Sequence, residues 1–238
     1  MHQITVQGLV VDVVRKDIKN LHLAVYPPTG RVRVAVPLLV NDEAVRLAVI
    51  SKLGWIKRQG GQFRNQERQS PRQYVSRESH YFQGRRYLLH VVYHDAPPQV
   101  RVRNKTMLDL FVRTGSNTAQ RGRALTEWYR QQLRQAATPL ISTWEQVIGV
   151  TAAEWGIKQM KTKWGSCNPQ AGRIWLNPEL AKKSPHCLEY IIVHELIHLL
   201  ERNHTDRFRA HMDRLLPQWK HYREELNREP LQHETWEY

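Results

Sequence analysis

The feature that most constrains this chain is the apolar run Tyr190–Leu200, which contains the pattern His-Glu-x-x-His. Each residue of a helix turns about 100° around the axis, so residues four apart lie about 40° apart on one side. His194 and His198 would therefore project side by side, the geometry in which two imidazoles bind one zinc ion. Glu195, beside the first histidine, would be close enough to act on a water at the metal.

A third histidine, His204, follows at a useful distance. If the helix continued that far, His204 would lie about 100° around the axis from the first pair, so the chain must leave the helix and turn back. Asn203 is one of the few non-glycine residue types that adopt the left-handed conformation ending many helices, and Thr205 can cap a new helix. We therefore expect a turn at Asn203, with His204 as third ligand and the fourth position open, as in catalytic zinc sites.

The carboxylate of Glu195 lies in so apolar a segment that it needs a partner to offset the cost of its burial. A water at the metal supplies one. In that role Glu195 is a general base that takes the proton of the water and later returns it to the leaving group. The structural alternative for the histidine pair is two half-buried side chains on a core helix.

Other residues near the motif have both a functional and a structural interpretation. Cys167 and Cys187 are candidate ligands, although lone cysteines more often pack in a core. Glu201 lies on the ligand side of the helix and would either orient a histidine by a hydrogen bond or face solvent. His211 either reaches the cleft or faces solvent, and Tyr190 is either an electrophile or a packing residue.

Charge is unevenly distributed along the 238 residues, whose net charge is +14. Residues 1–115 contain 19 Lys and Arg against 8 Asp and Glu, a net charge of +11, whereas residues 116–238 contain 17 against 14, a net charge of +3. A basic half attracts nucleic acid, nucleotide phosphates or acidic proteins, or is simply a solvated Arg-rich surface.

Several classes of protein are disfavoured by the sequence. No stretch approaches the ~18–20 apolar residues that a membrane span needs, and we recognise no signal peptide. Two cysteines make neither a disulfide framework nor a Cys-x-x-Cys site. We therefore expect a cytoplasmic protein with no membrane partner; its oligomeric state does not follow from the sequence.

The first half of the chain is mostly strand-like. A bulge is expected at Gly8, Asn41 or Asp42 should cap a helix that extends to about Gln59, and residues 57–73 read as a loop. The strand-like runs, with a Pro/Gly turn between the second and third, lie at residues 3–14, 21–26, 31–36, 87–93, 99–103 and 107–112.

The second half is mostly helical. A long helical pattern covers 118–148, where Pro139 should kink or split it, and Gly149 closes it. Strands at 155–166 and 173–177 should form a short hairpin beside the metal helix, which Ser184 can cap. We place the domain boundary so that residues 1–116 form a β-rich, basic region and residues 117–238 form the metal-dependent hydrolase domain.

Four segments together resemble the YgjP-like metallopeptidase family, which is related to the SprT-like and WLM zincins. The resemblance is specific over about 158–220 and general over the N-terminal half. Its segments are Lys161–Cys167, Ile174–Asn177, Val193–Leu199 and Asn203–Phe208.

The resemblance implies an α+β fold, in which a β-rich N-terminal region precedes a zincin-like domain with a short sheet and an active-site helix. It also implies Zn²⁺ held by His194, His198 and His204, with Glu195 as the catalytic acid/base. An edge strand in the Trp164 hairpin would bind extended substrate by strand addition. The chain departs from zincins of this ligand spacing at Glu201, where they often have Gly.

The leading hypothesis is a zinc-dependent hydrolase, a metallopeptidase acting on proteins or peptides. The first alternative is a metal-dependent nucleoside triphosphate pyrophosphohydrolase, suggested by the basic half and by Lys158, Lys161 and Lys163. The lack of a phosphate-cradling Gly-rich loop counts against it. The second alternative is a nucleic-acid-associated protein with a structural zinc, which binds DNA or RNA through residues 1–115.

Overall fold

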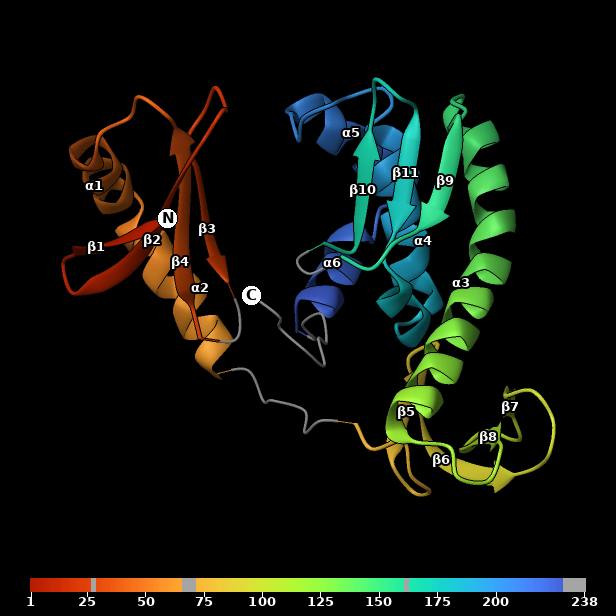
Figure 1. Ribbon diagram of the computed structural model, residues 1–238. Coiled ribbons are helices and arrows are strands. Elements are labelled where there is room, and N and C mark those ends of the chain that lie inside the picture. Colours follow the sequence, from red (N-terminus) through yellow and green to blue (C-terminus); the bar gives the residue numbers. More distant parts are fainter. Residues whose placement is uncertain (27–28, 66–71, 161–162, 229–238) are drawn as a thin grey trace. The chain divides into compact units, whose positions relative to one another are not determined.

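The computed structural model describes residues 1–26, 29–65, 72–160 and 163–228. They form two compact units, Met1–Arg68 and Gln69–Tyr238, each described by itself below. Over this part of the chain the fold is α+β, with six α-helices and sheets of mixed strand direction (Figure 1). None of the helices in the described ranges has the length and apolar content needed to cross a bilayer.

The first unit contains a four-stranded sheet of order β1-β2-β4-β3. β1 and β2 are antiparallel, β2 and β4 are parallel, and β4 and β3 form the expected antiparallel hairpin; Pro27 and Pro28 of its turn lie outside the described residues. The strands are β1 His2–Val6, β2 Leu9–Lys16, β3 His22–Tyr26 and β4 Arg31–Pro37.

The bulge expected at Gly8 is wrong. Val6 pairs with Leu9, so Gln7 and Gly8 form a two-residue turn between two strands, with φ of 47° and 78°. Left-handed φ at both positions is the geometry that joins twisted antiparallel strands most tightly. One long strand was expected because the apolar pattern continues on both sides of this turn.

Two helices cover the sheet of the first unit, α1 (Asp42–Ser51) and α2 (Leu53–Asn65). The sequence predicted one helix from Asn41 or Asp42 to about Gln59. Asn41 is indeed the N-cap, but the helix breaks at Lys52, and α2 extends into the segment expected as a loop. Residues 66–71 of that segment lie outside the described residues. The core that the helices and sheet share comprises Ile4, Val6, Val11, Val13, Val25, Val32, Val34, Val36, Val45, Val49 and Ile56.

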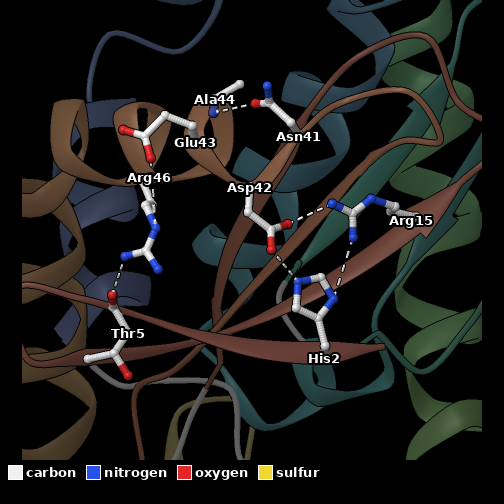
Figure 2. A network of polar contacts seen from close by, with 8 residues as sticks. All are labelled: His2, Thr5, Arg15, Asn41, Asp42, Glu43, Ala44 and Arg46. Atoms are coloured by element: carbon white, nitrogen blue, oxygen red, sulfur yellow. Dashed lines mark hydrogen bonds and ion pairs between the residues drawn. The ribbon is translucent and has the colours of Figure 1, made fainter.

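A polar network fixes the start of α1 to the sheet (Figure 2). Asp42 accepts a hydrogen bond from Arg15 at 2.6 Å and lies 2.9 Å from His2 Nε2. One turn later Arg46 donates to the carbonyl oxygen of Thr5 at 2.7 Å. The network therefore ties the first two turns of the helix to β1 and β2.

The second unit begins with another four-stranded sheet, of order β5-β6-β8-β7. Its strand order and directions repeat those of the first sheet, and its first turn again consists of Gln83 and Gly84 with φ of 48° and 74°. The strands are β5 Ser79–Phe82, β6 Arg85–Tyr93, β7 Gln99–Val102 and β8 Met107–Val112. The sequence predicted all of them except β5.

The longest helix of the described residues, α3 (Thr118–Ile148), follows this sheet. Asn117 and Gln120 form a capping box at its start, and Gly149 ends it with φ of 79°. Of the kink or split expected at Pro139, the split does not occur, because the helix is continuous from Thr118 to Ile148. Leu133, Ala137 and Ile141 are buried on both sides of the proline, so tertiary packing holds the two halves together.

The break between the units falls after Arg68, so the boundary predicted between residues 116 and 117 lies inside the second unit. That position separates β8 from α3, whose side chains share one core. The sheet contributes Phe82, Leu89, Leu108 and Leu110, and α3 contributes Leu125, Trp128 and Leu133. The change from strands to helices at this point of the sequence marks the passage from the sheet to the helix that packs on it, and both contribute to one core.

A three-stranded sheet of order β10-β11-β9 follows α3. One strand was expected over 155–166, but β9 ends at Ile157 and pairs parallel to β11, whereas β10 begins at Gly165 and pairs antiparallel to it. Figure 1 shows α4 running alongside this sheet, and α4 packs against β10, β11, α3, α5 and α6. The elements are β9 Glu154–Ile157, β10 Gly165–Asn168, β11 Arg173–Leu176, the 3₁₀ helix η1 Pro178–Lys182, α4 Pro185–Ile197, α5 Asp206–Leu215 and α6 Trp219–Arg228.

The shared core predicts how fragments of the chain behave. A fragment of residues 69–238 should unfold cooperatively on heating, because it keeps both sides of that core. A fragment of residues 117–238 should not, because it exposes Leu125, Trp128 and Leu133, each of which contributes about 1.5–3 kcal/mol when buried. Circular dichroism melts of the two fragments beside the full chain measure this, and a cooperative melt of 117–238 would contradict it.

Candidate metal centre

Helix α4 is buried on almost every side. Pro185 occupies its first turn. Ser184 stands at the N-cap position as expected, but its side chain makes no capping hydrogen bond. A helix that is apolar all round is a core helix, and the nine buried residues of α4 are Cys187, Leu188, Tyr190, Ile191, Ile192, Val193, Glu195, Leu196 and Ile197. His194 and Glu195 lie in its last turn, and His198 is its C-cap residue.

The left-handed turn expected at Asn203 is wrong, although the chain does turn back there. Asn203 is not among the residues with positive φ. The helix ends earlier, at Ile197, whose carbonyl oxygen accepts from the backbone N–H of both Leu200 and Glu201 at 2.9 Å. The chain therefore reverses by ordinary turns, and Thr205 caps α5 by accepting from Phe208 N.

The three predicted histidines come together at the end of α4. The Nε2 atom of His194 lies 3.2 Å from Nε2 of His198 and 3.0 Å from Nε2 of His204. Their ligand atoms all lie within 4.8 Å of one another. Two nitrogens bound tetrahedrally to one zinc ion at ~2.05 Å lie about 3.3 Å apart. The separations of His194 from His198 and from His204 therefore match tetrahedral coordination of one ion, and the three side chains together could hold a metal.

A backbone carbonyl orients His198. Its Nδ1 lies 3.0 Å from the carbonyl oxygen of Glu201, which can only accept, so Nδ1 carries the proton. The lone pair for a metal is then on Nε2, the atom that faces the other histidines. The sequence pointed to Glu201 for this role, but through its side chain. The carboxylate instead lies 3.5 Å from Arg207.

Phe208 forms a platform under the histidines, a role that the sequence did not reveal. Its ring is 2% exposed, and its centroid lies 4.9 Å from that of His194 and 4.8 Å from those of His198 and His204. A ring packed against all three imidazoles restricts their rotation. The only sequence signal was its position three residues after the N-cap Thr205.

The environment keeps His194 and His204 uncharged. Burial, and then the neighbouring His198 and His204, lower the pKa of His194 to about 3. Burial and His198 also lower the pKa of His204. A metal binds the neutral imidazole, so these residues are in the binding form at neutral pH.

Glu195 lies beside the cluster with only 5% of its surface exposed. Burial raises the pKa of its carboxyl to about 8, against an opposing effect of Lys163. The carboxyl packs directly on the backbone of Gly165, the first residue of β10. A Cβ atom at Gly165 would lie 2.5 Å from Oε1 of Glu195 and 2.8 Å from Cγ2 of Ile191. Only glycine leaves room for the carboxyl in this position.

A fully buried asparagine holds the segment that leads to Gly165. Asn177 is 0% exposed, and its Nδ2 donates to the carbonyl oxygens of Met160 at 2.7 Å and Lys163 at 2.8 Å. Its Oδ1 accepts from Glu179 N, and its own backbone N–H donates to Trp164 O at 2.9 Å. Asn177 therefore fixes where Lys163 and β10 lie beside Glu195.

The cluster opens into a pocket of about 580 Å³. Its lining comes from β10, which is an edge strand of its sheet among the described strands, from α4 and from the α4–α5 connection. The lining residues are Lys163, Gly165, Ser166, Cys167, Asn168, Pro169, Gln170, His194, Glu195, His198, Arg202, Asn203 and His204.

The other candidates stay outside the histidine cluster. Burial raises the pKa of Cys167 to about 11 and of Cys187 to about 12, so neither thiol is ionised at neutral pH. Tyr190 is buried and stacks on Trp219, which favours the packing role. Within the described residues the group that could hold a metal ion contains His194, His198 and His204, and His211 is not part of it.

A family model described as YgjP-like, metallopeptidase domain, matches residues 19–229. The chain belongs to the YgjP-like metallopeptidase family. The match covers most of both compact units, and it confirms the family that the sequence motifs indicated. Metallopeptidases are hydrolases that cleave peptide bonds with the help of a divalent metal, and the histidine cluster is a group that could hold one.

Comparison with curated proteins finds no match. Among solved structures, the crystal structure of the metallopeptidase zymogen of Pyrococcus abyssi abylysin is 21% identical to this chain. That match covers 36% of this chain and 87% of the other, with a TM-score of 0.34. A similarity at this level carries no argument about the fold.

The close approach of β10 to Glu195 predicts the effect of Gly165→Ala. The added methyl group must displace Glu195 or Ile191, and a misplacement of about 1 Å costs on the order of 10²-fold in activity. Metal content should stay unchanged, because the three atoms nearest the added methyl group belong to Glu195 and Ile191 and not to a histidine. Gly61→Ala is the matched control, since a Cβ there meets no atom within 4 Å. Equal activity of the two variants would contradict the proposed packing.

The hydrogen bonds of Asn177 predict a stability effect that is separate from the metal. Asn177→Ala removes the donors of two carbonyl groups and should lower the free energy of unfolding by about 2–4 kcal/mol. Asn168→Ala, which removes one bond to Ala171 N at 3.2 Å, should cost well under half of that. Urea unfolding of both variants measures the difference, and equal losses would count against the role of Asn177.

Proposed function

We propose that this protein is a zinc-dependent peptidase in which His194, His198 and His204 hold the metal and Glu195 is the general base. The observation that carries the proposal is the convergence of three Nε2 atoms beside a buried carboxyl group, at one wall of an open pocket. Family membership supports peptide-bond hydrolysis as the reaction.

Zinc is the metal that suits this set of donors. Three neutral imidazoles without a carboxylate ligand match zinc, whereas magnesium and calcium prefer oxygen ligands. Three protein ligands are typical of catalytic rather than structural zinc sites. When bound, the ion supplies Lewis acidity, which polarises a carbonyl group and lowers the pKa of water.

Glu195 moves the proton in the proposed reaction. Its carboxylate takes a proton from the attacking water as the water oxygen bonds to the carbonyl carbon of the substrate. It then gives that proton to the amide nitrogen as the C–N bond breaks. Burial, which favours the protonated carboxyl, helps Glu195 to keep the proton between the two steps.

The free edge of β10 provides the binding surface for an extended substrate. Among the described strands β10 pairs with β11 alone, and its residues line the pocket next to the histidines. A peptide that adds to this edge would gain main-chain hydrogen bonds. Its peptide bonds would pass beside Glu195, because Gly165 is the point where the strand meets that carboxyl.

Nucleoside triphosphate hydrolysis is the second candidate, because Lys163 and Arg202 line the same pocket. Against it, the chain has no Gly-rich phosphate loop. Release of pyrophosphate from nucleoside triphosphates by the purified protein tests this candidate directly. A nucleic-acid role for residues 1–115 is a separate proposal, and salt-sensitive binding of DNA or RNA tests it.

Two variants should separate metal binding from proton transfer. Glu195→Gln should keep zinc and lose on the order of 10²–10⁴-fold in peptide hydrolysis, because it keeps the shape of the side chain without its base. His204→Ala should lose zinc, because it removes one ligand of three. Metal content by mass spectrometry and cleavage of an unbiased peptide pool measure the two effects.

His211→Ala is the matched control for His204→Ala, because His211 lies outside the cluster of the described residues. It should keep both metal and activity. Full zinc content in the His204 variant would remove that residue from the ligand set, and full activity in Glu195→Gln would refute its role as base.

A further inference from the structure

The pocket beside the histidine cluster is lined by cations whose charges the chain leaves largely unbalanced. We propose that this site selects polypeptide segments with an acidic side chain next to the scissile bond, and that Arg202 and Lys163 are the residues that select them. The inference rests on the proposed peptidase function and names the substrate class of the same site.

Arg202 is the cation with the most direct support as a selecting residue. It lies in the connection between α4 and α5, two residues before His204, and it lines the pocket with an exposed side chain. The nearby charges are already matched: Glu201 pairs with Arg207 at 3.5 Å, and Asp206 pairs with Arg209 at 2.7 Å. None of the ion pairs among the described residues involves Arg202. Its guanidinium is therefore available to a carboxylate from outside.

Lys163 also lines the pocket, from a segment two residues before β10 begins. Its backbone is fixed by the hydrogen bond from Asn177 at 2.8 Å. Lys163 lines the same pocket as Glu195 and the three histidines. The two cations thus come from separate segments of the chain, one before β10 and one between α4 and α5.

The pocket has little negative charge to offset them. Glu195 is the one carboxylate among its lining residues, and it is only 5% exposed. A positive field in a concave site attracts anionic groups and raises their association rate.

The shape of the site favours a peptide as the carrier of that negative charge. The free edge of β10 offers backbone hydrogen-bonding groups in the register of an extended chain. A substrate strand on this edge places its side chains beside Lys163 at one end of the strand. A nucleotide would be attracted by the two cations but would form no backbone hydrogen bonds with the edge of β10.

The experiment uses the full-length, zinc-loaded protein and a peptide series in which the residues flanking the scissile bond are Glu, Gln or Lys. We expect kcat/KM to be about tenfold higher for Glu than for Gln, through KM, since each exposed charge pair contributes on the order of a threefold effect or more. The preference should fade as salt rises to about 0.5 M, where the Debye length is only a few ångströms. A preference that arises from shape would not fade.

Variants of Arg202 identify the residue responsible. Arg202→Gln should reduce the preference for Glu by about threefold, and Arg202→Glu should turn it towards Lys. Arg113→Gln is the matched control, because Arg113 is exposed, pairs with Asp95 and does not line the pocket. It should behave as the unmodified protein.

The outcomes separate this inference from the proposed function. Metal-dependent cleavage of the series without a preference for Glu, or a preference that Arg202→Glu leaves in place, overturns the inference and leaves the peptidase proposal standing. If zinc-loaded protein cleaves no peptide, both are overturned. Pyrophosphate release from nucleoside triphosphates, abolished by Arg202→Glu, would then assign the cationic pocket to nucleotides.

Discussion

The packing of the Glu195 carboxyl on the backbone of Gly165 is the contact on which the rest of the site depends. It brings an apolar core helix and an edge strand closer together than any side chain would permit. This close contact requires that both the helix and the strand are held in place. Asn177 fixes the segment before the strand, and the buried faces of α4 hold the helix in place. The carboxyl is thereby withdrawn from water, and the histidines remain at the mouth of the pocket.

Burial shifts the pKa values of a histidine and of a carboxyl group in opposite directions, and in both cases it disfavours the charged form. It lowers the pKa of His194 and raises that of Glu195, so both favour their uncharged forms before a metal binds. The protein alone therefore presents a nearly neutral centre framed by two cations. Any ion that enters adds its full positive charge. Binding of a metal and attraction of an anionic substrate would then be coupled through electrostatics.

The features that sequence analysis predicts correctly depend on local spacing. The four-residue separation of His194 and His198, the caps at Asn41, Thr205 and Gly149, and the β3–β4 hairpin all follow from short-range rules. The features it misses depend on contacts between distant segments. Gly165 faces a helix about 30 residues later, and Phe208 meets histidines from two other segments. The turn at Asn203 was misjudged because the helix was assumed to continue, whereas it ends at Ile197.

The two four-stranded sheets share their strand order, their Gln-Gly turn and an asparagine that caps the following helix. Gln7 and Gln83 are separated by 76 residues, as are Asn41 and Asn117. In the second copy the turn is anchored, since Gln83 N and Gly84 N donate to the carbonyl oxygens of Ala181 and Lys182. In the first, a Cβ at Gly8 would meet no atom within 4 Å. The chain thus carries one β-module twice. The second copy is tied through η1 to the segment that leads into α4, so its turn helps to place the helix that carries the histidines.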